Sequence, residues 1–92
     1  MLCYRRADGV LHEVVDSKVV LVHPDGKELL TLNPVGTLVW EAMDGPSDAA
    51  GLTDKLLPRL GGVPRHQVLA DISAFLTELT GLGLAVQSSS SG

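Results

Sequence analysis

Few residues of this 92-residue chain are of the types that do chemistry, and their spacing does not favour it. The side chains able to bind a metal ion are Cys3, His12, His23 and His66. No two of them lie two to five residues apart, as the ligands of a zinc site usually do. We therefore expect no metal site, and no motif calls for a cofactor.

Carboxylates, serines and glycines give no stronger case for catalysis. Asp71 and Glu78 are seven residues apart, so on a helix they share one face at about 10 Å. Charges on an amphipathic helix usually face water. The serines fall at turns, at helix caps, within a helix or in the tail, without a Gly-x-Ser-x-Gly elbow. The pair Gly61-Gly62 lacks the lysine of a phosphate loop, so we expect no catalysis by this chain alone.

Composition indicates one small domain with an aliphatic core. Hydrophobic residues make up 45% of the chain, yet Tyr4, Trp40 and Phe75 are its only aromatic side chains. The net charge is -4, and the 7 basic residues do not cluster beyond Arg5-Arg6. Nucleic-acid binding depends on neutralising several phosphates together. The charge balance therefore argues against a nucleic-acid partner.

Cellular context follows from what the sequence does not contain. Cys3 is the single cysteine, so no disulfide can form within the chain. The start lacks the apolar run of a signal peptide, and no stretch approaches the roughly 18 apolar residues of a membrane span. We expect a cytoplasmic protein.

Three strands are expected in the first third of the chain. Residues 10–15, 18–23 and 28–32 are rich in Val and Leu, and the second run is apolar enough to be a central strand. Asp16-Ser17 predicts a tight turn between the first two, and residues 23–26, ending in Gly26, predict the second turn.

Three helices are expected to follow. Asn33-Pro34 predicts a helix start, with the asparagine as cap and the proline in the first turn. A second helix, capped by Ser47 or Asp48, is expected to run to about residue 60, where two glycines end it. The third spans about residues 64–82 and has the widest apolar face. Residues 1–8 are expected to be a flexible terminus, residues 9–86 the domain, and residues 87–92 a disordered Ser/Gly tail.

Strands grouped before helices predict an α+β fold with an antiparallel sheet, similar to a winged helix-turn-helix domain. In such domains the third helix can read the DNA major groove. Here Asp71 and Glu78 on that helix would repel phosphate. A DNA-binding regulator is therefore the less favoured alternative.

The third strand is the expected binding element. If the strands pair in chain order, residues 28–32 form a sheet edge that carries no proline. An open edge beside an apolar helix face can accept an extended peptide as an added strand. The same edge could instead pair with a second copy, so we expect a monomer or a weak dimer.

Two motifs stand out in the helical part of the chain. The run from Leu32 to Gly45 reads Leu-Asn-x-x-Gly-x-x-x-Trp-Glu-x-Met-Asp-Gly. Further on, Val-x-x-Asp-Ile-x-x-Phe-Leu-x-x-Leu spans Val68 to Leu79, before Gly83. Together they resemble the PqqD-like family, which includes recognition elements of ribosomally made, modified peptide (RiPP) pathways. The resemblance covers about residues 10–86 and is closest to the short stand-alone form of lasso-peptide biosynthesis. Pro34 departs from the family pattern but suits a first helical turn.

The resemblance implies a non-catalytic protein that binds a precursor's leader peptide as a fourth strand and presents it to partner enzymes. These would be a leader peptidase and a cyclase in lasso pathways or, alternatively, a radical SAM enzyme in pyrroloquinoline quinone biosynthesis. It implies structural roles for Asn33, Gly36 and Trp40. Asp71 and Glu78 could meet a basic residue of the leader. The implied peptide-binding residues are Lys27, Glu28, Leu29, Leu30, Thr31, Leu32, Val68, Asp71, Ile72, Phe75, Leu76 and Leu79.

Overall fold

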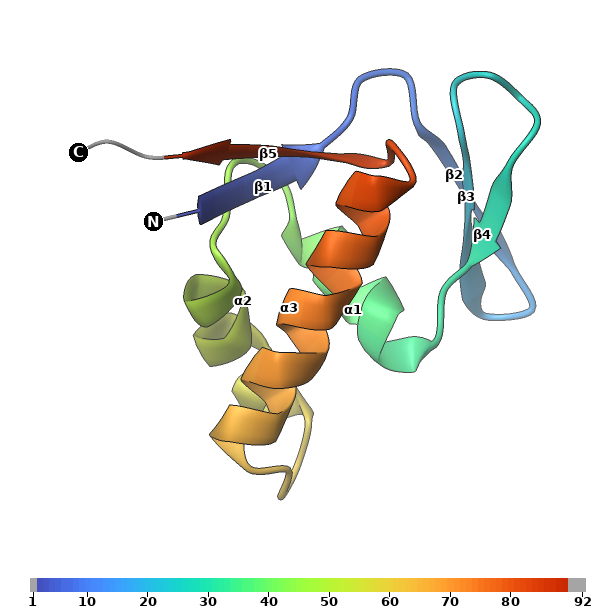
Figure 1. Ribbon diagram of the computed structural model, residues 1–92. Coiled ribbons are helices and arrows are strands. Elements are labelled where there is room, and N and C mark those ends of the chain that lie inside the picture. The colour runs from blue at the N-terminus through green and yellow to red at the C-terminus, as the bar shows by residue number, and fades with distance from the viewer. Residues whose placement is uncertain (1, 90–92) are drawn as a thin grey trace.

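The computed structural model describes residues 2–89, which form two small antiparallel sheets around three helices (Figure 1). One sheet has the strand order β2-β3-β4, with β2 at Leu11–Val15, β3 at Lys18–Val22 and β4 at Leu29–Thr31. The helices are α1 (Pro34–Ala42), α2 (Ala49–Leu56) and α3 (Arg65–Gly81), and a short 3-10 helix, η1 (Leu57–Arg59), follows α2. The expected α+β architecture is confirmed.

The hairpins form where turn chemistry predicts them. Asp16 and Ser17 both have positive φ angles, 52° and 68°, as a two-residue hairpin turn requires. At the second turn Gly26 has φ 74°, and its N–H donates to the His23 carbonyl at 2.8 Å. The Asp25 carboxylate accepts from the Lys27 N–H at 2.7 Å. These contacts set the register that makes β4 the edge of its sheet.

The start of α1 is fixed by its cap. Asn33 Oδ1 accepts a hydrogen bond from the Gly36 N–H at 2.6 Å, and Pro34 lies in the first turn. Because β4 ends at Thr31, only Leu32 and Asn33 separate the strand from α1. The cap therefore sets the angle between the sheet edge and the helices.

The second helix is shorter than expected. It ends at Leu56 and continues as η1, whereas we expected it to reach about residue 60. Pro58 has no N–H to donate and its ring disfavours a preceding α-helical turn, so the chain tightens into a 3-10 turn.

Residues 2–6, expected to belong to a flexible terminus, and residues 87–89, expected to belong to a disordered tail, lie in strands. β1 (Leu2–Arg6) pairs antiparallel with β5 (Ala85–Ser89), and both cross one end of α3 (Figure 1). β1 also forms a bridge to Ser47, whose carbonyl accepts the Tyr4 N–H at 2.7 Å. Tyr4 is only 9% exposed, so its burial holds this two-stranded ribbon on the helices. Residues 90–92 of the expected tail lie outside the described residues.

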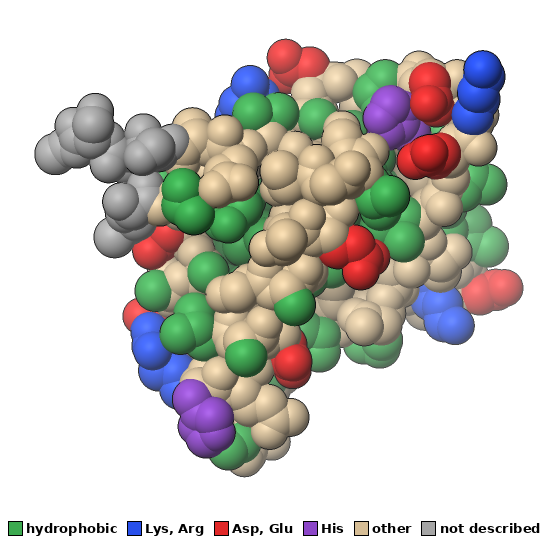
Figure 2. Space-filling model, viewed as in Figure 1, with side chains coloured by type: hydrophobic (Ala, Val, Ile, Leu, Met, Phe, Trp, Pro, Cys, Tyr) green, Lys and Arg blue, Asp and Glu red, His purple; other side chains and the backbone are tan. Residues whose placement is uncertain are grey.

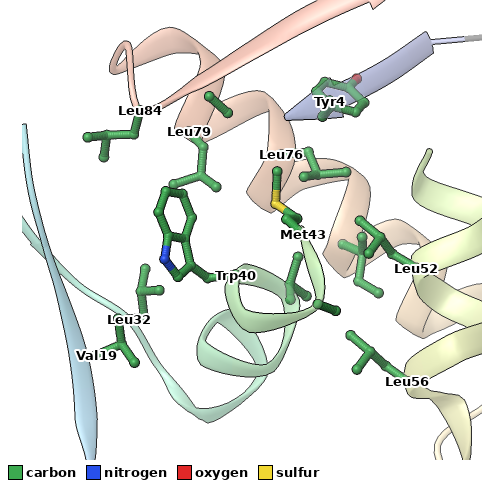
Figure 3. Close-up of a cluster of buried hydrophobic side chains, with 14 of the residues drawn as sticks. Tyr4, Val19, Leu32, Trp40, Met43, Leu52, Leu56, Leu76, Leu79 and Leu84 are labelled. Atoms are coloured by element: carbon green, nitrogen blue, oxygen red, sulfur yellow. The ribbon is translucent and has the colours of Figure 1, made fainter. Parts of the chain in front are cut away.

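The core lies between the helices and the inner face of the three-stranded sheet. Trp40 is 1% exposed and lies near its centre, flanked by Leu32, Leu79 and Met43 (Figure 3). Burying a large aliphatic side chain fully is worth roughly 1.5–3 kcal/mol. The stripe of α3 that contributes to the core consists of Val68, Ile72, Leu76 and Leu79.

Candidate functional site

The side chains that could bind a metal ion are spread over the molecule. Cys3 is on β1, His12 on β2, His23 at the second hairpin turn and His66 in the first turn of α3. Among residues 2–89, no group of three or more His, Cys, Asp or Glu side chains lies close enough to hold a metal ion. No helix of the described part of the chain is long and apolar enough to cross a membrane.

β4 has one unpaired edge, and the register shows which backbone groups it offers. The Leu32 N–H donates to the Val19 carbonyl at 2.8 Å, and the His23 N–H donates to the Glu28 carbonyl at 3.0 Å. In an antiparallel ladder such hydrogen-bonded pairs alternate with non-bonded ones. Leu30, opposite Leu21, therefore also bonds towards β3. The N–H and C=O groups of Leu29 and Thr31 point away from β3, towards the open edge.

A hollow of about 220 Å³ lies between this edge and α3. We call it the β4–α3 groove. Its lining comes from the end of β4, the start of α1 and one face of α3. The lining residues are Leu30, Thr31, Leu32, Asn33, Ala74, Phe75 and Glu78.

Close packing of α1 on α3 sets the floor of the groove. A Cβ atom placed on Gly36 would lie 3.2 Å from Cε1 of Phe75 and 3.1 Å from Oδ1 of Asn33. Any side chain at position 36 would therefore press on the half-buried Phe75 ring or on the helix cap. The absence of a side chain keeps Phe75 in place as an apolar surface beside β4.

The predicted strand residues occupy the edge, but not all of them line the groove. Leu30 and Leu32 face the helices, and Thr31 lines the groove with its backbone at the open edge. Leu29 is 69% exposed on the outer face of the sheet. Lys27 and Glu28 are exposed in the hairpin and do not line the groove. Peptide contact by any of them remains a prediction.

On α3, the structure separates the predicted residues into three groups. Phe75 lines the groove, and Asp71 is exposed just outside its lining. The other four are at most 3% exposed and form the core stripe, so they support the groove wall and are not accessible to a peptide. They are Val68, Ile72, Leu76 and Leu79. The reason is that the apolar stripe of α3 packs into the core, whereas the adjoining face of the same helix borders the groove.

Three lining residues were absent from the predicted peptide-binding set, although Glu78 was expected to be able to meet a basic residue of the leader. They are Asn33, Ala74 and Glu78. Ala74 and Glu78 follow from helical spacing, since positions 71, 74, 75 and 78 share a face when Phe75 points towards the strand. Asn33 lines the groove because the same side chain that caps α1 stands at the end of β4.

The groove side of the molecule is acidic. Figure 2 shows acidic side chains in the middle of the face that α3 presents, with Lys and Arg side chains towards its periphery. Glu78 is the single charged residue in the groove lining. Among the described residues, Arg5 pairs with Asp8 and Arg65 with Asp54, and the His23 ring lies 3.1 Å from the Asp25 carboxylate, so neither Glu78 nor Asp71 has a partner in this part of the chain. An acidic α3 face does not suit a DNA-reading helix.

Two further hollows lie elsewhere on the described residues. Only one of them touches a strand, at Arg5-Arg6 of β1, whose outer side already bridges to Ser47. One, of about 300 Å³, lies between α1 and the α2–η1 segment, with Glu41, Lys55 and Arg59 at its rim. The other, of about 250 Å³, lies between Arg5-Arg6 and the turn after α1. The β4–α3 groove is therefore the best candidate site, since it alone of these three combines an open backbone edge with an apolar wall.

Comparison with known proteins agrees with this architecture. The sequence profile of "Coenzyme PQQ synthesis protein D (PqqD)" matches residues 18–85. The structure is similar to that of "TbiB1 in Complex with the TbiA(beta) Leader Peptide", with a TM-score of 0.77 and 25% identity over 88% of this chain and 93% of the other. It is equally similar to "Lasso peptide synthetase B1 complexed with the leader peptide", with a TM-score of 0.77 and 25% identity over 90% and 96%.

No curated protein sequence matches the chain. The family match nevertheless extends over well more than half of the 92 residues and includes β3, β4 and all three helices. It also includes both motifs on which the resemblance was based. The chain therefore belongs to the PqqD family.

Proposed function

We propose that the β4–α3 groove binds the leader segment of a ribosomally made precursor peptide, as an added strand on β4. The observation that carries this proposal is the unpaired edge of β4 beside a hollow of about 220 Å³ walled by Phe75. Support comes from two similar structures, each of which is described as a complex with a leader peptide.

The geometry indicates how affinity and specificity would divide. The outward N–H and C=O groups of Leu29 and Thr31 would bond the peptide backbone whatever its sequence. Alternate peptide side chains would then face the helices, over Phe75 and Leu30, and the others would face outward. Sequence preference would come from the side chains that enter the groove.

The chain would act as a binding protein and leave catalysis to a partner. Among lasso-peptide pathways, the partners would be a leader peptidase and a cyclase. The match to the PqqD profile favours a second candidate, presentation of a peptide to a radical SAM enzyme in pyrroloquinoline quinone biosynthesis. Both candidates use the same groove, and the genes beside this one would distinguish them.

Backbone hydrogen exchange with a bound leader tests the proposal. The probe is a synthetic peptide covering the leader of the precursor encoded beside this gene, compared with a scrambled peptide of the same composition. We expect slower exchange at the Leu29 and Thr31 amides with the leader alone. Protection confined to α2, or equal protection by the scrambled peptide, would contradict strand addition.

A further inference from the structure

The β4–α3 groove has a charged end. Glu78 is exposed, lines the groove, and has no basic side chain within 4.0 Å among the described residues. The remaining lining is apolar or uncharged. A peptide in the groove therefore meets one carboxylate that has no ion-pair partner among the described residues.

The end of α3 adds to this negative potential. Glu78 lies in the last turn of the helix, and that turn contains no basic residue. Carbonyl groups at a helix C-terminus carry a partial negative charge, which favours nearby cations. The Glu78 carboxylate and the C-terminus of α3 therefore both favour a cation at this end of the groove.

Spacing relates this end to the apolar part of the groove. Along an extended peptide, side chains on one face recur about every 6.8 Å. Along α3, Glu78 lies three residues beyond Phe75, a rise of about 4.5 Å. A long, flexible side chain can span the difference of about 2 Å. If one peptide side chain lies over Phe75, the side chain two positions further along the peptide therefore lies within reach of Glu78.

We propose that the peptide recognised in this groove carries Lys or Arg two positions from an apolar residue, and that Glu78 selects for that cation. The inference rests on the proposed function and specifies the chemistry of its ligand. A solvent-exposed ion pair of this kind contributes up to about 1 kcal/mol to binding, which corresponds to about fivefold in affinity.

Selection from a displayed library of random dodecapeptides tests the inference. The library is panned against the wild-type chain, Glu78→Lys and Asp71→Asn. Asp71→Asn is the matched control, because it removes an exposed carboxylate from the same helix face but outside the groove lining. We expect Lys or Arg two positions from an apolar residue with wild type and Asp71→Asn, and Asp or Glu at that position with Glu78→Lys.

One selected peptide is then measured with its Lys changed to Gln. We expect about fivefold weaker binding to the wild type and less than about twofold weaker binding to Glu78→Gln. An equal loss in both proteins, an unchanged selection by Glu78→Lys, or the same change of selection with Asp71→Asn would overturn the inference.

Hydrogen exchange separates this failure from failure of the proposed function. Peptides that protect the Leu29 and Thr31 amides but show no cation preference would overturn the role of Glu78 and leave strand addition standing. If no peptide is selected, or if selected peptides protect neither amide, the proposed function fails and the inference fails with it.

Discussion

At the scale of single residues, Arg6 connects β1 to the end of α1. Its Nε donates to the Trp40 carbonyl at 3.1 Å, its Nη2 donates to the same oxygen, and its guanidinium lies 4.9 Å from the Trp40 ring centroid. The last turn of α1 has no basic residue of its own. Arg6 therefore supplies the cation that favours a helix C-terminus and bonds a carbonyl there.

We predict that Arg6→Lys lowers the free energy of unfolding by about 1 kcal/mol, because an ammonium group cannot both stack on the ring and form two bonds to one oxygen. Arg5→Lys is the matched control, since Arg5 is exposed and its Asp8 partner is 3.8 Å away. Urea unfolding followed by Trp40 fluorescence measures both. Equal effects would show that Arg6 contributes only charge.

Asp25 gives the β3–β4 hairpin a pH dependence. The Lys27 N–H, followed by the charge of His23, holds the pKa of the Asp25 carboxyl below its ordinary value of 3.8. A lowered pKa in the folded state means that the ionised form stabilises the hairpin. That stability is present above pH 3.8 and is lost as the pH falls through the folded pKa.

We predict that Asp25→Asn is less stable than the wild type at pH 7 and that the difference in stability shrinks as the pH falls below 3.8. Denaturation of both proteins at a series of pH values from 7 to 3 measures this difference in stability. The other carboxylates titrate equally in both proteins, so their effects cancel. The difference should persist in a His23→Gln background, since the Lys27 amide is the larger cause. A difference that stays constant with pH would contradict the assignment.

At the scale of elements, the edge of β4 decides whether a strand can be added. We predict that Thr31→Pro keeps the fold, because the Thr31 N–H points away from β3, yet weakens leader binding at least about tenfold. Thr31→Val is the control, since it keeps the N–H and the strand preference and should bind normally. Titration calorimetry measures affinity, and circular dichroism checks the fold. Unimpaired binding by folded Thr31→Pro would exclude β4 as the docking edge.

Local signals explain which elements the sequence predicts. The Asn33-Pro34 helix start and the Asp16-Ser17 turn depend on neighbouring residues, and both are confirmed. β1 and β5 could not be predicted in this way, because each consists of few apolar residues and pairs with the opposite end of the chain. Likewise, the period of α3 reveals its apolar stripe, but only the packed structure shows that Ile72 is in the core and Phe75 in the groove.

At the scale of the whole molecule, the groove depends on parts that the family match does not include. The profile begins at residue 18, yet β1 pairs with β5, which directly follows α3. The contacts of Tyr4 with Ser47 and of Arg6 with Trp40 join this ribbon to the segment between α1 and α2 and to α1 itself. Residues 2–6 therefore stabilise the helix bundle that holds α3 opposite β4.

We predict that Tyr4→Ala lowers the free energy of unfolding by about 3 kcal/mol, because the Tyr4 side chain is buried where β1 crosses the helices. Leu2→Ala, on the same strand but 47% exposed, should cost less than about 1 kcal/mol. Guanidinium denaturation gives both values. If β1 holds α3 opposite β4, folded Tyr4→Ala should also bind the leader more weakly. Normal stability in Tyr4→Ala would mean that the domain begins at β2 and that the ribbon is dispensable.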